Sequence, residues 1–352
     1  MIDLRSDTVT LPTEAMLEAM ACAELGDDSR EGDPTVRRLE DAAASMIGSE
    51  AAILVTSGTM GNLVALLTHG QRGGEVLLDP LSHILKSEMG GIARLAGLFH
   101  RVYPAESGAA DVSALREMLK PQLVRNGLGT ALVCVETTHN SAGGAVVSLK
   151  TLADLRALTL EKQIPVHIDG ARIFNAAVAL NVPVSEISQY ADSVSFCISK
   201  GLSAPFGSLL CGSHSFIEQA RAFRRMVGGG MRQAGVVAAS GIVALEHMVE
   251  RLADDHRRAK AIARGINQLD ARYVDPHRVH TNIVMVDVSH TRTMAANWVL
   301  ALAEEGVDVR TWTPTALRFV THRHIGDAAV VRTIESFRTV ASKLREATAS
   351  GK

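Results

Sequence analysis

Short apolar runs alternate with amphipathic segments over the first two thirds of this sequence, and this alternation restricts the fold more than any other feature. Segments 83–97, 112–120 and 149–162 carry apolar residues at helical spacing between those runs. Parallel strands need helical crossovers of this kind, so the pattern predicts an α/β fold with a large, mostly parallel sheet covered by helices. The runs expected to form strands are Ala51–Thr56, Glu75–Leu78, Phe99–Tyr103, Ala131–Glu136, Val166–Asp169, Ser193–Cys197 and Ser208–Cys211.

The pattern changes in the last third of the chain, where long stretches of helical periodicity follow one another. A smaller α/β unit comes next, with strands expected near Asn282–Val288 and Leu317–Thr321 and a closing helix over Ala328–Ala347. We therefore predict two domains, a large one over residues 1–250 and a small C-terminal α/β domain over residues 251–352.

Composition limits the kinds of partner. The chain has 352 residues, of which 47% are apolar and 21% charged, as is ordinary for a soluble globular protein. Its 36 basic and 38 acidic residues give a formal charge of −2, so we expect no binding to nucleic acid or to a membrane surface. The sequence has no apolar stretch of membrane-spanning length, and its first residues lack the pattern of a signal peptide. These features favour a cytoplasmic protein.

Cysteine usage agrees with a reducing compartment. The four cysteines form no CxxC pair, and each lies in or beside an apolar run. We therefore expect buried thiols instead of disulfides. The residues concerned are Cys22, Cys134, Cys197 and Cys211.

Lysine is scarce, with eight among the 36 basic residues, and Lys200 has an unusual setting. It follows the strand-like run 193–199 and precedes Gly201 and a turn, which puts its ammonium at the carboxyl end of a buried strand. Ligands of open α/β sheets bind at that edge, and a lysine shielded from water there can act as an imine-forming amine. The alternative is a structural lysine whose stem lies along the strand end while its charge stays in water.

A second candidate is Asp169, in the segment HIDGARIF. Strand alternation turns His167 and Asp169 to the same face of the sheet, and Gly170 ends the strand where a ligand can approach. A carboxylate at such a position needs a cation or hydrogen-bond donors. Asp169 could hold the protonated nitrogen of a pyridine ring, or it could simply pair with Arg172.

Two glycine-rich segments suit an anionic ligand. TSGTMGN, residues 56–62, joins a strand to an apolar helix, and small residues at a helix N-terminus expose N–H groups to a phosphate. The segment has no P-loop lysine and does not fit GxGxxG, so nucleotide sites of those kinds are not predicted. GGGMRQ, residues 228–233, offers Arg232 for bidentate phosphate contact, although a glycine run also serves as a simple hinge.

These pieces together match the needs of one cofactor. A strand-end lysine, an aspartate 31 residues before it and a phosphate cradle upstream are what pyridoxal 5′-phosphate requires. The chain also resembles the low-specificity L-threonine aldolases, pyridoxal-phosphate enzymes of the β-eliminating lyase group. The resemblance runs nearly end to end and rests on LRSDTVTLPTEAM, GDPTV, SGTMGN, ETTHNSAGG, HIDGARIFNAA, SFCISKGLSAPFGS, GGGMRQAG and RFVTH.

The resemblance implies the aspartate-aminotransferase-like fold (fold-type I) and a role for each matched residue, and we predict no metal among the site residues. Lys200 corresponds to the lysine that forms a Schiff base with the cofactor, and Asp169 to the partner of the ring nitrogen. His83 corresponds to a histidine that stacks on the ring. The remaining implied contacts are Gly58, Thr59, Arg172 and a neighbouring subunit's Arg232 for the cofactor, Ser6, Arg172 and Arg318 for the substrate carboxylate, and Glu88 and His139 in supporting roles.

The same resemblance implies a reaction. The enzyme would split the Cα–Cβ bond of L-threonine, L-allo-threonine or a related β-hydroxy-α-amino acid into glycine and an aldehyde. His83 is the expected base for the β-hydroxyl proton, either directly or through a water. The alternatives are another pyridoxal-phosphate β-carbon lyase, a phenylserine-type aldolase with altered side-chain preference, a serine/glycine-type transfer, and an inactive cofactor-binding regulatory subunit.

Two positions depart from the family pattern near the expected substrate side chain. Arg30 stands where the family usually has a tyrosine, and Asn126 stands where it often has a histidine. Each change is either tolerated in a pocket of loose specificity or a sign of altered preference for the β-substituent or β-epimer. Since Arg232 is expected to complete a neighbour's phosphate site, the resemblance also implies a homo-oligomer, at least a dimer and most simply a tetramer of two dimers.

Overall fold

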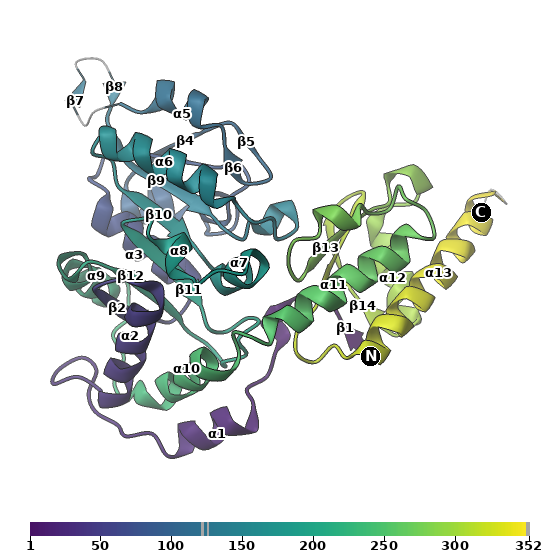
Figure 1. Ribbon diagram of the computed structural model, residues 1–352, viewed down its shortest axis with the longest axis horizontal. Helices are drawn as coiled ribbons and strands as arrows, with labels where there is room; N and C mark the ends of the chain where they lie inside the picture. Colours follow the sequence, from purple (N-terminus) through teal and green to yellow (C-terminus); the bar gives the residue numbers. More distant parts are fainter. Residues whose placement is uncertain (121–122, 125–126, 350–352) are drawn as a thin grey trace. The chain divides into compact units, whose positions relative to one another are not determined.

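The computed structural model describes residues 1–120, 123–124 and 127–349, and Figure 1 shows the chain coloured along its sequence. Contacts divide the chain into a large unit, Leu11–Ala142 with Val146–Val249, and a small unit, Met1–Thr10 with Gly143–Ala145 and Glu250–Lys352.

The domain boundaries expected from the sequence stay a prediction, and the grouping by contacts differs from them at the N-terminus. Residues 1–10 belong to the small unit because strand β1 (Ile2–Asp3) pairs in parallel with β14 (Val307–Asp308). The backbone of Leu4 continues this contact by accepting a hydrogen bond from Val320 N–H at 2.8 Å. A pairing between residues some 300 positions apart leaves no trace in local sequence patterns.

The large unit is built on one sheet. Within the described part of the chain, seven strands line up in the order β2-β12-β11-β10-β9-β3-β4. Strand β12 is antiparallel to both of its neighbours, and the other adjacent strands are parallel. This confirms the predicted mixed, mostly parallel sheet. The strands are β2 Ala51–Val55, β3 Glu75–Leu78, β4 Phe99–Val102, β9 Thr130–Glu136, β10 Val166–Asp169, β11 Ser193–Cys197 and β12 Ser208–Gly212.

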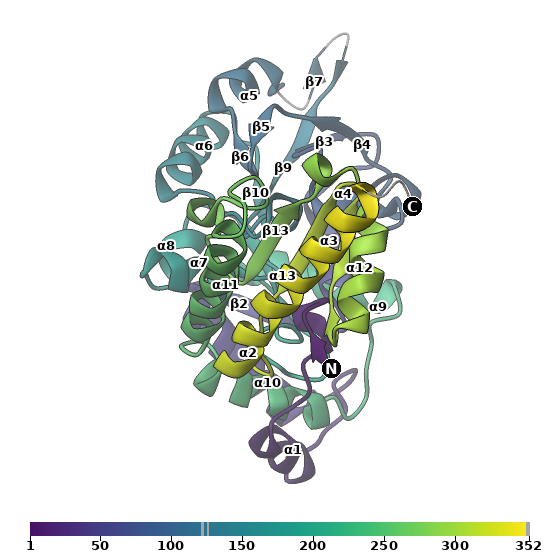
Figure 2. The ribbon, with the colours of Figure 1, turned by 90° about the vertical axis from the view of Figure 1, so that its right-hand side faces the viewer.

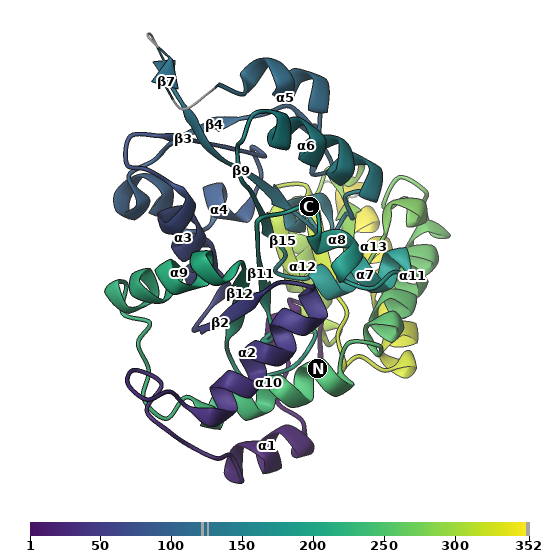
Figure 3. The same ribbon diagram turned by 60° about the vertical axis from the view of Figure 1, so that its left-hand side comes forward.

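Helices lie on both faces of this sheet. Figure 3 shows α3 and α9 on one side of the central strands and α6, α7 and α8 on the other. The helices of the large unit are α1 Glu14–Ala21, α2 Pro34–Ile47, α3 Gly58–His69, α4 His83–Lys86, α5 Val112–Met118, α6 Leu149–Glu161, α7 Ile173–Leu180, α8 Ser185–Ser188, α9 His214–Met226 and α10 Gly235–His247. Its shorter elements are β5 Ala105–Glu106, β6 Ala109–Ala110, β7 Leu123–Val124, β8 Gly127–Leu128, a helical turn over Ile92–Ala96 and another over Asn140–Ala142.

The central strands are apolar because both faces of the sheet are covered. Every residue of β3, β9, β10, β11 and β12 is buried. Strands buried on two faces give continuous apolar runs instead of strict alternation, and this is the signal that the sequence carried. Each of the seven predicted strands is therefore found, with both ends within one residue of the prediction.

The single helix expected from the apolar spacing across residues 83–97 is wrong. Helix α4 ends at Lys86, and a separate turn covers Ile92–Ala96. Between them Met89 and Gly90 have φ angles of 56° and 75°, which a right-handed helix cannot include. Residues five positions apart point in different directions on a regular helix, so the interruption lets His83 and Glu88 face each other.

The expectations about environment have mixed outcomes. All four cysteines are free thiols, but the expected burial holds for three of them only, because Cys22 directly follows the short helix α1 and is exposed. In the part of the chain that the structure describes, we find no helix with the length and apolar content that a membrane crossing requires.

The small unit packs helices on an antiparallel sheet. Strands β13, β16 and β15 form the sheet in that order, and Figure 2 shows α13 running between α11 and α12. Its core is aromatic, with the Trp298 and Phe337 rings stacked at 5.0 Å and Tyr273 edge-on to Phe337 at 5.1 Å. The remaining elements are α11 Leu252–Asn267, α12 Ala295–Glu304, α13 Asp327–Ala349, β13 Ile283–Asp287, β15 Arg310–Thr313, β16 Ala316–Val320 and helical turns over Asp7–Val9, Pro276–Arg278 and Ser289–Thr291.

We expect Trp298→Ala to destabilise the small unit by about 3–5 kcal/mol, because the ring is fully buried and its removal leaves a cavity. Equilibrium unfolding in urea, followed by fluorescence and circular dichroism, measures the loss. Leu300→Ala on the same helix is the matched control. Its side chain is 66% exposed, so its replacement should change stability by less than about 0.5 kcal/mol. Equal effects of the two changes would contradict the prediction.

Candidate active site

Lys200 and Asp169 lie at one edge of the large sheet. Strands β10 and β11 are parallel neighbours, with Asp169 aligned with Ser195, so their carboxyl ends meet at the same edge. Asp169 is the last residue of β10, and Lys200 comes three residues after the end of β11. Crevices outside the carboxyl ends of such strands are the usual ligand sites of α/β sheets.

Asp169 is held by two hydrogen bonds, one from helix α3 and one from the turn that follows β10. Its carboxylate is 2% exposed and accepts from Asn62 Nδ2 at 2.9 Å and from the backbone N–H of Ala171 at 3.1 Å. A carboxylate has about four acceptor positions, so two donors leave it able to accept a further N–H. The donor set therefore fits a protonated ring nitrogen.

His83 completes a chain of side chains that begins at Asp169. Asn62 Nδ2 also donates to Glu88 Oε1 at 2.8 Å, and the same oxygen lies 2.9 Å from His83 Nδ1. The hydrogen bond to Glu88 raises the pKa of His83 above its usual value, and the negative charge of Asp169 acts in the same direction. Lys200 is close enough to oppose this shift, which puts all four ionisable groups within electrostatic range of one another.

A third carboxylate supports the backbone beneath His83. Glu136 ends strand β9, where it is aligned with Asp169 on β10. Its two oxygens accept from the N–H groups of His83, at 2.6 Å, and Asn140, at 2.8 Å. Burial raises the pKa of the Glu136 carboxyl. Three acidic side chains thus collect at this edge, where a cationic ring would offset their charge.

The glycine-rich turn meets the same edge from helix α3. Gly58 is the first residue of α3, and the side chain of Ser57 caps the helix by accepting from Met60 N–H at 3.2 Å. A Cβ added at Gly58 would lie 2.9 Å from Cys197 Sγ at the end of β11, so only glycine allows this close approach. Thr59 beside it is exposed. The exposed N–H groups of the first turn fit a phosphate monoester.

The other predicted residues of the large unit lie in three places. Arg172 is buried as the N-cap residue of α7. His139 is buried, with Nε2 3.1 Å from Asp79 Oδ1. Arg30 and Arg232 are exposed and share one partner, since Arg30 Nε lies 3.9 Å and Arg232 Nη1 3.2 Å from Asp27 Oδ2.

Two predicted residues belong to the small unit. Ser6 caps the turn over Asp7–Val9, with its Oγ accepting from Thr8 N–H at 3.2 Å. Arg318 is buried in β16, and its guanidinium lies 5.1 Å from the centre of the Trp312 ring. The remaining predicted residue, Asn126, lies outside the described residues.

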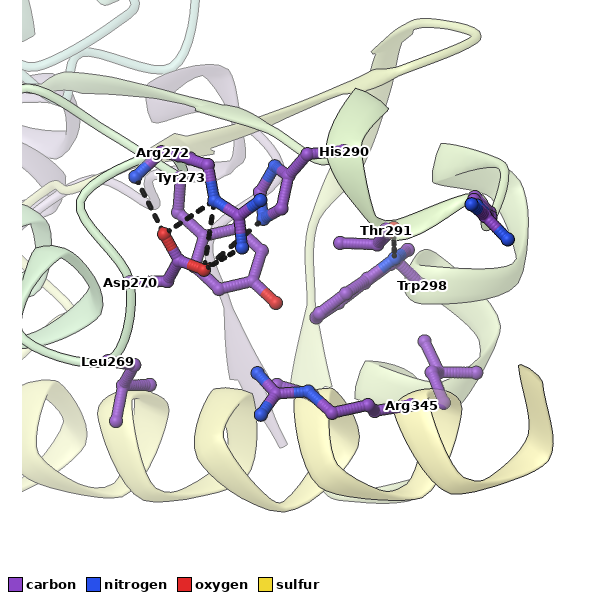
Figure 4. Close-up of a pocket in the computed structure, with 11 residues that line it drawn as sticks. Leu269, Asp270, Arg272, Tyr273, His290, Thr291, Trp298 and Arg345 are labelled. Atoms are coloured by element: carbon purple, nitrogen blue, oxygen red, sulfur yellow. Dashed lines mark hydrogen bonds and ion pairs between the residues drawn. The ribbon is translucent and has the colours of Figure 1, made fainter. Parts of the chain in front are cut away.

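The small unit also has a cavity of about 480 Å³, drawn in Figure 4. Asp270 and Arg272 form a bidentate pair on one wall, with Nη2–Oδ2 at 2.6 Å, and Trp298 and Arg345 form other walls. None of the residues predicted from the sequence lines this cavity. The cavity is therefore separate from the predicted site residues.

Sequence reasoning missed the residue that joins the predicted groups. Asn62 lies within the motif SGTMGN, which the sequence analysis treated as a phosphate cradle alone. Its Oδ1 accepts from Ser195 Oγ at 2.7 Å and lies 3.1 Å from His167 Nε2. The available signal was polar residues at alternate positions of two apolar strands, His167 with Asp169 and Ser193 with Ser195.

Comparison with known proteins identifies relatives that span most of the chain. The model of the family described as beta-eliminating lyase matches residues 3–291. Low-specificity L-threonine aldolase 1 of Arabidopsis thaliana is 41% identical over 349 residues, which cover 98% of each chain. The low specificity L-threonine aldolase of Escherichia coli K12 is 43% identical over 296 residues, 84% of this chain and 87% of that one.

Solved structures share the fold at lower identity. A threonine aldolase of Leishmania major superposes with a TM-score of 0.82 at 17% identity, covering 97% of this chain and all of that one. A serine palmitoyltransferase of Sphingomonas wittichii gives 0.77 at 18% identity, covering 97% and 88%. These likenesses confirm the predicted aspartate-aminotransferase-like fold.

Glu88→Gln tests the electrostatics of this cluster. The change removes the negative charge beside His83 Nδ1, so the pKa of His83 should fall and its protonated form should persist over a narrower pH range. NMR titration of the protein carrying ¹³C-labelled histidine gives the value directly. Glu246→Gln removes a carboxylate that lies beside His247 instead, and it should leave the His83 titration unchanged. An unchanged or higher pKa in Glu88→Gln would contradict the arrangement.

Proposed function

The chain belongs to the beta-eliminating lyase family, and we propose that it is a carbon–carbon lyase that splits L-threonine, L-allo-threonine or a related β-hydroxy-α-amino acid into glycine and an aldehyde. The observation that carries this proposal is the cluster of His83, Glu88, Asn62 and Asp169 beside Lys200. Support comes from the L-threonine aldolases that match nearly the whole chain at 41–42% identity.

The cofactor is pyridoxal phosphate, and the large unit holds the groups that it needs. Lys200 Nζ would hold it covalently, Asp169 would bind its ring nitrogen, and the first turn of α3 at Gly58 and Thr59 would bind its phosphate. Arg172 is a further proposed contact. When bound, pyridoxal phosphate supplies an electron sink for the negative charge left at Cα after the Cα–Cβ bond breaks. Its protonated ring nitrogen matches the acidic edge of the sheet.

His83 is the proposed base. Its Nδ1–H donates a hydrogen bond to Glu88 Oε1, which leaves Nε2 to accept the β-hydroxyl proton. As that proton leaves, the hydroxyl oxygen becomes the carbonyl of the aldehyde, and a proton delivered to Cα completes glycine. Because Glu88 raises the pKa of His83, the neutral imidazole is a stronger base toward the β-hydroxyl proton.

Ser6, Arg172 and Arg318 are the proposed ligands of the substrate carboxylate. Arg318 is suited to this task because a planar guanidinium binds a carboxylate with two parallel hydrogen bonds. Stacking on Trp312 restricts the orientation of its fork. A fixed carboxylate would in turn restrict the orientation of Cα, and so would select which of its bonds breaks.

Release of glycine and aldehyde from L-threonine and L-allo-threonine tests the proposed reaction. Lys200→Ala should lower the rate at least about 10³-fold and remove the visible absorbance of the bound cofactor. Lys150→Ala is the control, because Lys150 is exposed and pairs with Asp154 on α6. Formation of pyruvate and ammonia instead of glycine would overturn the aldolase assignment. A panel of threo and erythro β-hydroxy-amino acids then measures which configuration at the β-carbon the enzyme prefers.

We also propose a cytoplasmic homo-oligomer, most simply a tetramer of two dimers, in which Arg232 reaches the phosphate of a neighbouring subunit. Arg232 is exposed in its own chain, and its guanidinium sits with that of Arg30 beside Asp27. In this arrangement Arg30 accompanies Arg232 toward the neighbour's site. Arg30, together with Asn126, is then the proposed source of any altered preference for the substrate side chain.

Mixing two inactive variants tests this sharing. Lys200→Ala and Arg232→Ala should each lose activity alone, whereas subunits mixed in equal amounts should regain about a quarter of the wild-type activity. The recovery arises because half of the random dimers carry one intact site. Size-exclusion chromatography with light scattering gives the mass in parallel. An active monomer, or no recovery after proven exchange of subunits, would overturn the proposal.

A further inference from the structure

A line of polar side chains runs from Asn62 behind Asp169, and the proposed reaction does not use its members beyond Asn62. Asn62 and His69 come from helix α3, His167 from β10, and Ser193 and Ser195 from β11. All but His69 are at most 1% exposed. A helix normally packs on a sheet through apolar side chains, so buried polar groups at the interface between α3 and the sheet need a specific reason.

The amide of Asn62 can adopt only one orientation. Glu88 Oε1 and Asp169 Oδ2 lie 2.8 and 2.9 Å from Nδ2, and a carboxylate oxygen can only accept. The amide oxygen must therefore face Ser195 Oγ, at 2.7 Å, and His167 Nε2, at 3.1 Å. A flipped amide would put its oxygen against two carboxylates.

That orientation determines the proton positions further along the line. His167 Nε2 must donate to Asn62, and burial lowers the pKa of His167 to about 4, so the ring carries one proton. Its Nδ1 then accepts from Ser193 Oγ at 2.9 Å, and Ser193 Oγ in turn accepts from His69 Nε2 at 2.8 Å. Every hydrogen bond from His69 onward is thus donated toward Asp169.

We propose that His167, supported by Ser193, is a positioning residue that orients the amide of Asn62 and through it the carboxylate of Asp169. This inference rests on the proposed role of Asp169 as the partner of the cofactor's ring nitrogen. An apolar interface could hold α3 against the sheet, but it could not determine which way the oxygen and nitrogen of the Asn62 amide face.

The interface between α3 and the sheet also links the proposed phosphate cradle to the proposed ring-nitrogen site. Asn62 is four residues after Gly58 on α3, so one helix carries both the phosphate cradle and the partner of Asp169. Gly61 between them lies close to β11, since an added Cβ would be 3.4 Å from Ser195 Cβ. Orienting Asn62 against β10 and β11 therefore keeps a fixed spacing between the groups for the phosphate and the ring nitrogen.

The test compares variants of the full chain by their Kd for pyridoxal phosphate, measured from fluorescence quenching. His167→Leu removes the donor to Asn62 and should weaken binding about tenfold, because a buried acceptor loses its partner. His167→Gln retains a donor at the same reach and should bind within about threefold of wild type. Ser193→Ala leaves Nδ1 of His167 without its donor and should weaken cofactor binding by a smaller factor. This variant replaces His167→Leu in the test if His167→Leu does not fold.

Ser240→Ala is the matched control, because Ser240 is fully buried in the same unit and donates to Val237 O outside this line. It should bind the cofactor as wild type does. Equal losses in His167→Leu and His167→Gln would mean that His167 acts through packing alone, and wild-type affinity in both His167→Leu and Ser193→Ala would mean that it does not act at all. Either result overturns the proposal.

Asp169→Asn separates this inference from the proposed function. If Asp169→Asn weakens cofactor binding while His167→Leu does not, the role of Asp169 stands and the positioning role of His167 is wrong. If Asp169→Asn binds the cofactor as wild type does, the assignment of Asp169 itself is wrong. The absorbance maximum of the bound cofactor provides a second readout. It should move in His167→Leu, return in His167→Gln and stay unchanged in Ser240→Ala.

Discussion

The amide of Asn62 between Glu88 and Asp169 is the interaction on which the rest of the site depends. Two carboxylates on different elements are brought within hydrogen-bond reach of one nitrogen, and that nitrogen belongs to helix α3. Buried like charges repel strongly unless donors lie between them. The amide supplies those donors, and its position is set by the packing of α3 on the large sheet.

The chemistry proposed for the site follows from that arrangement. Glu88 accepts a hydrogen bond from Asn62 and forms a second one with His83. The orientation of His83, the proposed base, therefore also depends on the Asn62 amide. The main chain of His83 is held independently by Glu136 at the end of β9. Helix α3 and the end of strand β9 thus supply the hydrogen-bond partners that hold Glu88 and His83 in place for the reaction.

Much of this arrangement could be predicted from the sequence, and the misses have physical causes. The strands were predictable because burial on both faces leaves continuous apolar runs, and Lys200 and Asp169 because each follows such a run. The break between α4 and the next turn was not predictable. The apolar spacing across residues 83–97 continues through Met89 and Gly90, although the positive φ angles of these two residues do not allow a helix. Asp169 was expected to need a cation or a donor, and the donor Asn62 lies 107 residues away in the chain.

The sequence by itself determined the class of fold, the positions of the strands, the cofactor and the family, because each of these depends on local periodicity or on short motifs. The tertiary structure alone decided which side chains meet. It joined residues 1–10 to the small unit, paired His83 with Glu88, and turned Asn62 from an apparent member of a phosphate cradle into the link between two carboxylates. Such contacts depend on the register of neighbouring strands and on the docking of a helix, and no single stretch of sequence specifies either.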